Sequence, residues 1–331
     1  MKRKKMDIRP RLLDALQEQI VLMPLPNKDV FLDPEDVARH NMALRPFLAG
    51  AQCIEASNVA RFFEDSYTTD PEDFKSFWKD LKCLVPPFKS FFIEWEKPYG
   101  IPHALRMGML FLACPPELAD ATARALLGEN AHTTPIRIAE FRAEFNPKWI
   151  YLTFDFVEFP NKDQKNISGL RGPYHVGVTA VAEDGALHNF WMNHGATNSI
   201  SVHESMQLGL AALVGWTALS MMNCQNIDTV EHVAPEPYQR SRSRKGKKPL
   251  VSFRTIQVNM EKTPRSIGAE HLPVIDSDGK RLHQKRGHMK DYRKGKGLFG
   301  RYKGLWYWGP HLAGSGSEGV VISDYAVEPA K

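Results

Sequence analysis

Histidines, arginines and aromatic residues gather in residues 283–311, toward the C-terminal end of the chain. His283 and His288 lie on either side of Lys285 and Arg286. Lysine and arginine neutralise phosphates, and a histidine with a pKa near neutrality can donate or accept a proton. Aromatic rings offer flat faces on which unpaired bases stack. The segment therefore has the composition of a nucleic-acid contact, with His283 and His288 as candidate catalytic residues.

A second basic run, residues 239–248, holds six Lys or Arg and no apolar residue. Such a composition does not support a packed core and predicts a mobile loop that acts as an electrostatic arm. The residues predicted to bind nucleic acid in the two runs are Arg240, Arg242, Arg244, Lys245, Lys247, Lys248, Lys285, Arg286, Gly287, His288, Lys290, Tyr292, Arg293, Lys294, Gly297 and Trp306.

The charge of the whole chain, +5, conceals a strong asymmetry. Residues 238–303 contain 19 basic and 5 acidic side chains, a balance of +14, whereas residues 1–237 have a balance of −7. An acidic body that carries a basic segment is typical of a protein that binds a polyanion. Nucleic acid is the partner that this pattern favours.

The chain carries no Walker phosphate loop, dinucleotide-binding glycine fingerprint, HExxH or GxSxG motif. Its four cysteines are far apart and form no CxxC pair, which disfavours a zinc site and a disulfide framework. A three-histidine metal site is disfavoured too, because no carboxylate or cysteine lies at a supporting spacing. We therefore expect no metal and no cofactor.

The chain begins with a basic stretch, but no apolar segment of a signal peptide follows it. Residues 208–222 form the longest apolar stretch, which is too short to span a bilayer. The sequence therefore predicts a cytoplasmic protein that does not bind a membrane.

The elements that position these residues are predicted from periodicity and from turn signals. Helices are expected in the first 85 residues, where Asp33-Pro34 and Asp70-Pro71 are N-cap pairs and Pro46 ends or kinks the first of these helices. Pro115-Pro116-Glu117 opens a further helix that Gly128 closes. A capping box at 201–204 begins an apolar helix that runs to about residue 222.

Strands are expected at 91–95, 106–113, 136–145, 149–158, 175–181, 186–192, 251–258 and 319–327. Together the elements predict an α+β fold: a helical N-terminal part, a largely antiparallel sheet with a buried central helix, and a basic C-terminal segment. The predicted division is 1–85 (helical N-terminal part), 86–237 (α+β body) and 238–331 (basic C-terminal part).

The aromatic residues of the first strand admit two interpretations. Phe91, Phe92 and Trp95 fill the core, or they line a sheet edge that captures an extended peptide as an added strand. The first interpretation is favoured, because aromatic residues in apolar strands are generally buried. The sequence assigns no residue to peptide binding.

The C-terminal signature resembles that of a type V-A anti-CRISPR family. The resemblance is carried by His283-x-x-Arg286-Gly287-His288, followed by Tyr292, Gly295-x-Gly297, Trp306 and Pro310. The family is spread through phages and mobile elements, and its namesake blocks production of the type V-A effector nuclease. The resemblance implies recognition of the N-terminal peptide of the nascent nuclease, followed by degradation of its mRNA. It implies RNA-facing or decay-linked roles for His283, Arg286, Gly287, His288, Tyr292, Gly297 and Trp306.

From the resemblance we therefore expect an anti-CRISPR-like inhibitor of protein biogenesis, whose body binds a nascent peptide and whose basic part engages RNA or the translating ribosome. The RNA is cut by the protein or by a recruited host ribonuclease, and the lack of a carboxylate cluster favours recruitment. Two alternatives stay open. One is a metal-independent nuclease that uses His288 or His283 for acid–base chemistry and Arg286 or Lys285 to hold the phosphate. The other is a plain nucleic-acid-binding module of a phage or mobile element.

Overall fold

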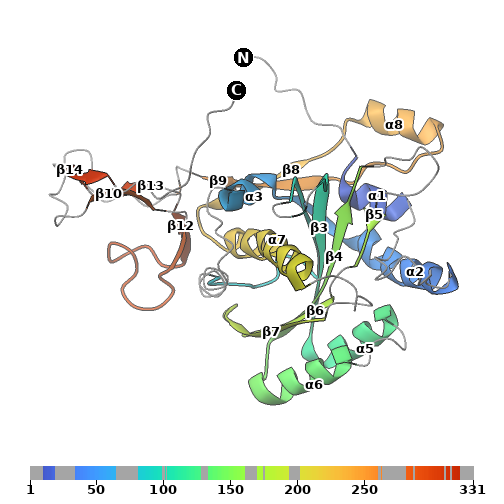
Figure 1. Ribbon diagram of the computed structural model, residues 1–331, viewed down its shortest axis with the longest axis horizontal. Helices are drawn as coiled ribbons and strands as arrows, with labels where there is room; N and C mark the ends of the chain where they lie inside the picture. The colour runs from blue at the N-terminus through green and yellow to red at the C-terminus, as the bar shows by residue number, and fades with distance from the viewer. Residues whose placement is uncertain are drawn as a thin grey trace.

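A nine-stranded sheet forms the centre of the molecule (Figure 1). The computed structural model describes residues 10–18, 34–64, 81–98, 101, 103–127, 133–160, 170–173, 176–193, 202–259, 262, 281–285, 288–308, 311–313 and 315–320. The strand order is β7-β6-β4-β3-β2-β1-β9-β8, and β5 pairs with β4. Only β1 runs parallel to its neighbours, β2 and β9; the other pairs of this sheet are antiparallel.

The strands of this sheet are β1 (Gln52–Glu55), β2 (Ser90–Glu96), β3 (Arg106–Cys114), β4 (Trp149–Glu158), β5 (Leu170–Arg171), β6 (Val176–Val181), β7 (Leu187–Asn193), β8 (Ile227–His232) and β9 (Phe253–Val258). The predicted strands at 91–95, 106–113, 149–158, 175–181, 186–192 and 251–258 are confirmed within a few residues. Together with the helices, this sheet confirms the α+β class.

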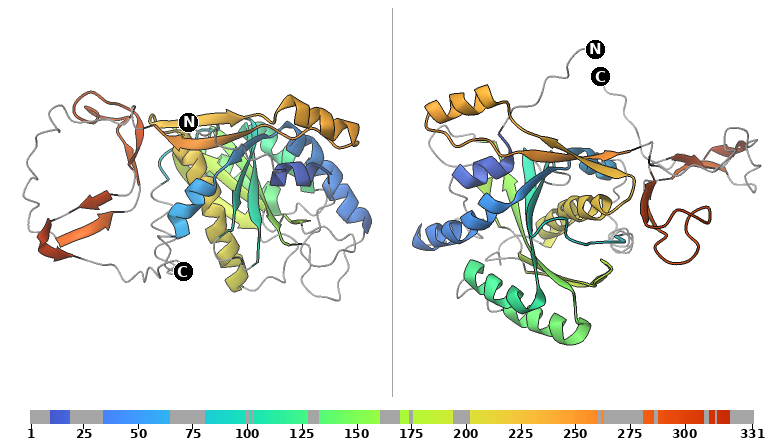
Figure 2. Two further views of the ribbon diagram at one scale, coloured as in Figure 1. Left: turned by 90° about the horizontal axis from the view of Figure 1, so that it is seen from above. Right: turned by 180° about the vertical axis from the view of Figure 1, so that it is seen from behind.

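Helices cover both faces of the sheet (Figures 1 and 2). They are α1 (Leu12–Glu18), α2 (Pro34–Gly50), α3 (Ser57–Glu64), α5 (Pro116–Leu127), α6 (Thr133–Phe145), α7 (Val202–Met222) and α8 (Glu236–Arg244). Residues of α3 and α7 share one apolar cluster with one face, and residues of α1, α2, α5 and α6 share another with the opposite face. Because both faces are buried, β2, β3 and β4 are apolar almost throughout rather than alternating.

The predicted central helix is α7, which packs on the sheet as expected. Trp216 of this helix meets Phe111 and Tyr151 edge to face, with ring centroids 5.0 and 5.7 Å apart. Phe91, Phe92 and Trp95 are at most 1% exposed, so these rings fill the core and do not line a peptide groove.

Residues 136–145, predicted to be a strand, form part of helix α6. The prediction was wrong because it weighted isoleucine and phenylalanine content over spacing. Ile138 and Phe141 are buried three residues apart on one face of the helix, and Arg137 and Glu140 form an ion pair at the same spacing. Pro46 does not end helix α2, which continues through this residue to Gly50.

Strands from all three predicted parts of the chain belong to the same sheet, because β1 lies in 1–85, β2 in 86–237 and β9 in 238–331. Two smaller sheets follow: β11 (His288–Asp291) with β12 (Leu305–Trp308), and β10 (Arg281–Lys285) with β13 (His311–Ala313) and β14 (Ser315–Val320). The last strand begins at Ser315 rather than at 319, and 321–331 lie outside the described residues. The predicted helix start at Asp70-Pro71 and the predicted stop at Gly128 lie outside them too.

A buried carboxylate ties helix α1 to the sheet. Glu94 of β2 is 2% exposed; its Oε2 accepts the Leu13 backbone N–H at 3.2 Å, and its Oε1 lies 3.9 Å from Arg11 Nη1. Burial raises the pKa of Glu94 to about 7, against the attraction of Arg106 and Arg11. Arg11 also lies over the Phe253 ring, 3.6 Å from its centroid.

Candidate nucleic-acid interface

The basic segment 288–308 is a two-stranded hairpin, β11 and β12, closed by the loop 292–304. The register pairs His288 with Trp308 and Asp291 with Leu305. One face of the hairpin is anchored in the body, because Met289, Leu305 and Tyr307 are buried in the same apolar cluster as α7. The loop itself projects away from the body (Figure 1).

Backbone hydrogen bonds give the loop 292–304 a fixed shape. The Tyr292 N–H donates to the Gly304 carbonyl at 2.8 Å, and Leu298 and Tyr302 exchange two bonds of 2.8 and 2.9 Å. Gly297 has φ +83°, and a Cβ there would stand 2.8 Å from the Tyr302 carbonyl oxygen. Glycine is thus required at 297 for both conformation and space. We call this element the basic loop.

Arg293 holds the basic loop against the body. Its guanidinium makes a bidentate pair with Asp291, at 2.7 Å from Nη2 to Oδ2 and 3.0 Å from Nε to Oδ1. It also donates to the backbone carbonyls of Asp184 and Lys82. The Arg293 side chain, by its hydrogen bonds, lowers the pKa of Asp291. The donors of this predicted nucleic-acid ligand are therefore committed to internal contacts, which makes Arg293 a positioning residue.

Asn226, which was not predicted from the sequence, makes the second connection between the body and the hairpin. Its side chain is fully buried, and it donates from Nδ2 to the Tyr307 carbonyl at 2.8 Å. Its Oδ1 accepts the Tyr307 N–H at 2.9 Å. The side-chain amide of Asn226 thus bonds the Tyr307 backbone in the way that a residue of a paired strand would. The N–H of the adjacent Gln225 donates a further bond to the Leu305 carbonyl.

Cations dominate the exposed surface of the basic loop. Residues 293–304 hold five Lys or Arg and no carboxylate. The exposed members of the hairpin and loop are Lys290, Lys294, Lys296, Arg301 and Lys303. Among the described residues, no ion pair involves any of these five. Lys290 and Lys294 were among the predicted ligands. Lys296, Arg301 and Lys303 were not.

Most aromatic rings of the hairpin pack within it. Trp306, a predicted stacking residue, is 7% exposed and meets the Tyr302 ring edge to face, with centroids 5.9 Å apart. Trp308 lies under the ammonium of Lys290, 5.2 Å from its ring centroid. Tyr292 is half-buried. Phe299 differs from them: it is 50% exposed, near the middle of the loop sequence.

The two candidate catalytic histidines belong to different sheets. His288 is half-buried in β11, whereas His283 lies in β10, opposite Ala313 of β13. The side chains of His283 and Lys285, and the whole of Arg286 and Gly287, lie outside the described part of the structure. Among the residues that it does describe, no group of three His, Cys, Asp or Glu is arranged to hold a metal ion.

The predicted mobile arm at 239–248 is largely helix α8 and the turn after it, so that prediction was wrong. The helix begins with Pro237 in its first turn and is supported by the Glu236–Arg240 pair one turn apart. Gln239 fixes the returning chain through two hydrogen bonds with the Leu250 backbone, of 2.8 and 2.9 Å. The prediction relied on the lack of apolar residues, but in this segment hydrogen bonds and ion pairs of polar side chains hold the helix and the turn in place.

Arg242 is internal to this element. It is 9% exposed; its Nη2 lies 3.1 Å from Glu18 Oε1 and its Nε donates to the Lys248 carbonyl at 2.9 Å. Lys248 donates in turn to the Gln17 carbonyl, and Arg240 is paired with Glu236. Of the six predicted ligands in this run, Arg244, Lys245 and Lys247 are exposed and have no ion pair within the described residues.

Replacing Arg242 tests this assignment. We expect Arg242→Ala to lower the free energy of unfolding by about 1–2 kcal/mol, because a charged hydrogen-bond network is lost and the Lys248 carbonyl loses its donor. Urea denaturation measures the change. Arg244→Ala, two residues away and exposed, is the control and should stay within about 0.5 kcal/mol of the wild type. Equal effects would contradict the internal role of Arg242.

The two basic runs lie at opposite ends of the molecule, with α8 at one end and the β11–β12 hairpin at the other (Figures 1 and 2). They therefore do not form one continuous patch. The basic loop and its hairpin together carry five exposed cations without an ion pair among the described residues, whereas the end of α8 carries three. The loop also offers an exposed ring, which makes it the stronger candidate interface.

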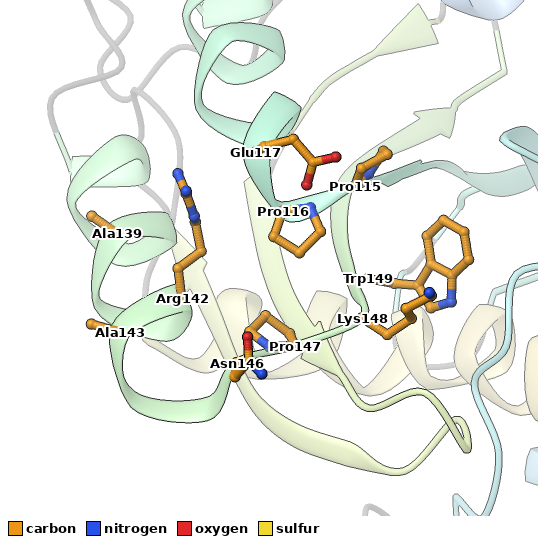
Figure 3. A pocket seen from close by; sticks show the side chains of 10 residues that line it. All are labelled: Pro115, Pro116, Glu117, Ala139, Arg142, Ala143, Asn146, Pro147, Lys148 and Trp149. Carbon is orange, nitrogen blue, oxygen red and sulfur yellow. The ribbon is translucent and has the colours of Figure 1, made fainter.

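A pocket of about 760 Å³ hollows the body (Figure 3). It is lined by Pro115, Pro116, Glu117, Ala139, Arg142, Ala143, Asn146, Pro147, Lys148 and Trp149. Arg142 comes from α6, Glu117 from the first turn of α5, and Trp149 from the start of β4 (Figure 3). Proline, alanine and tryptophan surfaces with two cations and one carboxylate suit a peptide segment better than a polyanion.

Comparison with known protein families, curated proteins and solved structures finds no match to this chain. The candidate interface is therefore defined by its own geometry. None of the helices in the described ranges is long and apolar enough to cross a membrane.

Phe299 and Asn226 also lay outside the predicted set, for identifiable reasons. Phe299 stands between Gly297 and Gly300, a local signal that could have marked an exposed ring in a turn. Asn226 precedes a strand and has no sequence neighbour that suggests its partner, Tyr307, 81 residues away.

Proposed function

We propose that this protein binds RNA through the basic loop and acts as an anti-CRISPR-like inhibitor of protein biogenesis. The observation that carries the RNA part is the loop itself, an ordered turn with five basic residues, no carboxylate and one exposed ring. Cations held in a fixed arrangement bind a phosphate backbone with less loss of entropy than a flexible arm does.

The resemblance of residues 283–310 to the type V-A anti-CRISPR family supports the more specific form of the proposal. The body would recognise the nascent N-terminal peptide of a target such as a type V-A nuclease, on a translating ribosome in the cytoplasm. The encoding mRNA would then be degraded. The pocket lined by residues of α5, α6 and β4 supports a peptide partner, since its proline, alanine and tryptophan side chains are accompanied by Arg142 and Lys148.

Recruitment of a host ribonuclease is the favoured route to decay. The described residues contain no cluster of carboxylates, histidines or cysteines that would hold catalytic metal ions. His288 lies in β11 and His283 in β10, which belong to different sheets.

Two triple variants with the same change of charge test the proposal. Lys294, Lys296 and Lys303→Ala removes three exposed cations from the basic loop, and Arg244, Lys245 and Lys247→Ala removes three from α8. We expect the loop variant to bind a single-stranded RNA about tenfold or more weakly and to reduce the salt slope by about 2, because each phosphate contact in a single strand contributes about 0.7. The α8 variant should lose less affinity. Fluorescence anisotropy at several salt concentrations gives both quantities.

The same pair of variants gives a readout in cells. With the target co-expressed, the wild type and the α8 variant should lower the target mRNA, and the loop variant should leave it intact. A target with a recoded N-terminal peptide is the control for peptide recognition. Equal losses of RNA affinity in the two variants would refute the basic loop as the site. RNA binding without mRNA loss would favour a plain nucleic-acid-binding module.

A further inference from the structure

We propose that Phe299 stacks on an unpaired base, so that the basic loop selects single-stranded RNA over duplex RNA. The inference rests on the proposed RNA binding and adds the class of nucleic acid and the residue that selects it. It concerns a side chain that the basic composition of the segment does not identify.

The backbone of the loop holds Phe299 in an unfavourable conformation. Its φ is +51°, in the left-handed region that a phenylalanine rarely adopts. Gly297 at φ +83° and Gly300 at φ +73° bracket it, and the Gly300 N–H donates to the Gly297 carbonyl at 3.2 Å. A strained, non-glycine residue held by its surroundings is a feature that clusters at ligand sites.

Much of the Phe299 side chain lies at the surface. Phe299 is 50% exposed, whereas Trp306 and Tyr307 in the adjacent strand are 7% and 5% exposed. Within the described residues 288–308, Phe299 is the one large hydrophobic side chain that is exposed. The exposed half of the ring is apolar surface left in water, and a bound partner would cover it.

The surrounding charge indicates the chemistry of that partner. Lys296 precedes Phe299 by three residues, and Arg301 and Lys303 follow it by two and four, all exposed. One nucleotide presents a flat apolar base beside an anionic phosphate, and a ring among cations matches both parts. An acidic peptide would satisfy the cations but supplies no flat face for the ring.

Duplex RNA would engage the loop differently. Its bases are stacked on each other and its readable groove shows mainly sugar hydroxyls and phosphates. The cations would still contact phosphates, but Phe299 would have no base face to cover. The ring is therefore the part of the loop that distinguishes the two forms of RNA.

The test measures binding of the full chain to a mixed-sequence single-stranded RNA of 12 nucleotides and to the corresponding duplex. We expect Phe299→Ala to weaken single-strand binding about 5- to 100-fold, the range that one base–aromatic stack gives. Duplex binding should change less than about twofold, since only phosphate contacts hold it. Phe299→Trp should keep single-strand affinity, and Leu118→Ala, which removes a 55% exposed side chain from α5, should change neither.

Several outcomes would overturn the inference. Equal losses on the single strand and the duplex would make Phe299 a general support of the loop. Equal weakening of polyglutamate binding would make it an apolar contact for acidic protein. RNA binding that depends on the loop lysines but not on Phe299 would refute the stacking role and leave the proposed function standing. No RNA binding by the wild-type protein would refute the proposed function itself.

Discussion

Replacing Asn226 by alanine is expected to lower the free energy of unfolding by about 2–4 kcal/mol. The substitution removes two hydrogen bonds to the Tyr307 backbone and leaves its N–H and carbonyl buried. A buried backbone group without a partner costs about 1–3 kcal/mol, and water cannot reach this fully buried site to replace the amide. The loss should exceed that of any single exposed substitution in the basic loop.

Urea denaturation measures the total loss, and hydrogen exchange locates it. The Tyr307 amide should lose protection in Asn226→Ala, together with its neighbours in β12, while the central strands β3 and β4 keep theirs. Asn189→Ala is the control: Asn189 is exposed on β7, and its side-chain oxygen accepts a hydrogen bond from the N–H of its neighbour Phe190. A loss below about 0.5 kcal/mol in Asn226→Ala would contradict the anchoring role.

The Asn226 anchor also governs how the basic loop meets its partner. Asn226 and Arg293 join the hairpin to the body at two points, and the guanidinium reaches the carbonyls of Asp184 and Lys82. If either point is lost, the loop keeps its cations but not its orientation. RNA affinity should then fall less than it does on removal of the lysines themselves.

The sequence predicted the sheet well where local signals were sufficient. The hairpin of β6 and β7 follows from Glu183-Asp184-Gly185, and Gly185 takes φ +83° there. Helix α7 follows from a capping box and an apolar run. Segment 136–145 failed because Ile and Phe suit a strand as well as a buried helix face, and only the spacing of Ile138 and Phe141 separates the two.

The candidate site was predicted less completely, because composition counts cations without showing their partners. Arg242 and Arg293 have the residue type expected of a phosphate ligand, yet Glu18 and Asp291 bind them within the fold. Those partners are 224 residues away in one case and two in the other, so no rule of spacing reveals both. Exposure, which decides that Phe299 and not Trp306 is available, depends on tertiary packing.

Glu94 should make the stability of the wild-type protein fall as pH rises from about 5 to 8. Its carboxyl has an ordinary pKa of 4.5 and a pKa of about 7 in the folded protein, raised by burial. The folded state therefore binds the proton more tightly than the unfolded state does. The stabilising effect is full below pH 4.5 and is lost as pH rises through 7. Between pH 5 and pH 8 the loss amounts to about 2–3 kcal/mol.

Glu94→Gln should remove this dependence, because glutamine has the shape of the protonated acid and still accepts the Leu13 N–H. Arg11, 3.9 Å away, faces an anion in the wild type only where Glu94 is ionised, and the Glu94 pKa of about 7 already includes that attraction. The variant should thus gain about 2–3 kcal/mol on the wild type between pH 5 and pH 8, measured by urea denaturation at each pH. Glu117→Gln, in the exposed first turn of α5, is the control and should leave the wild-type profile unchanged. Parallel profiles for wild type and Glu94→Gln would show that Glu94 does not change protonation on folding.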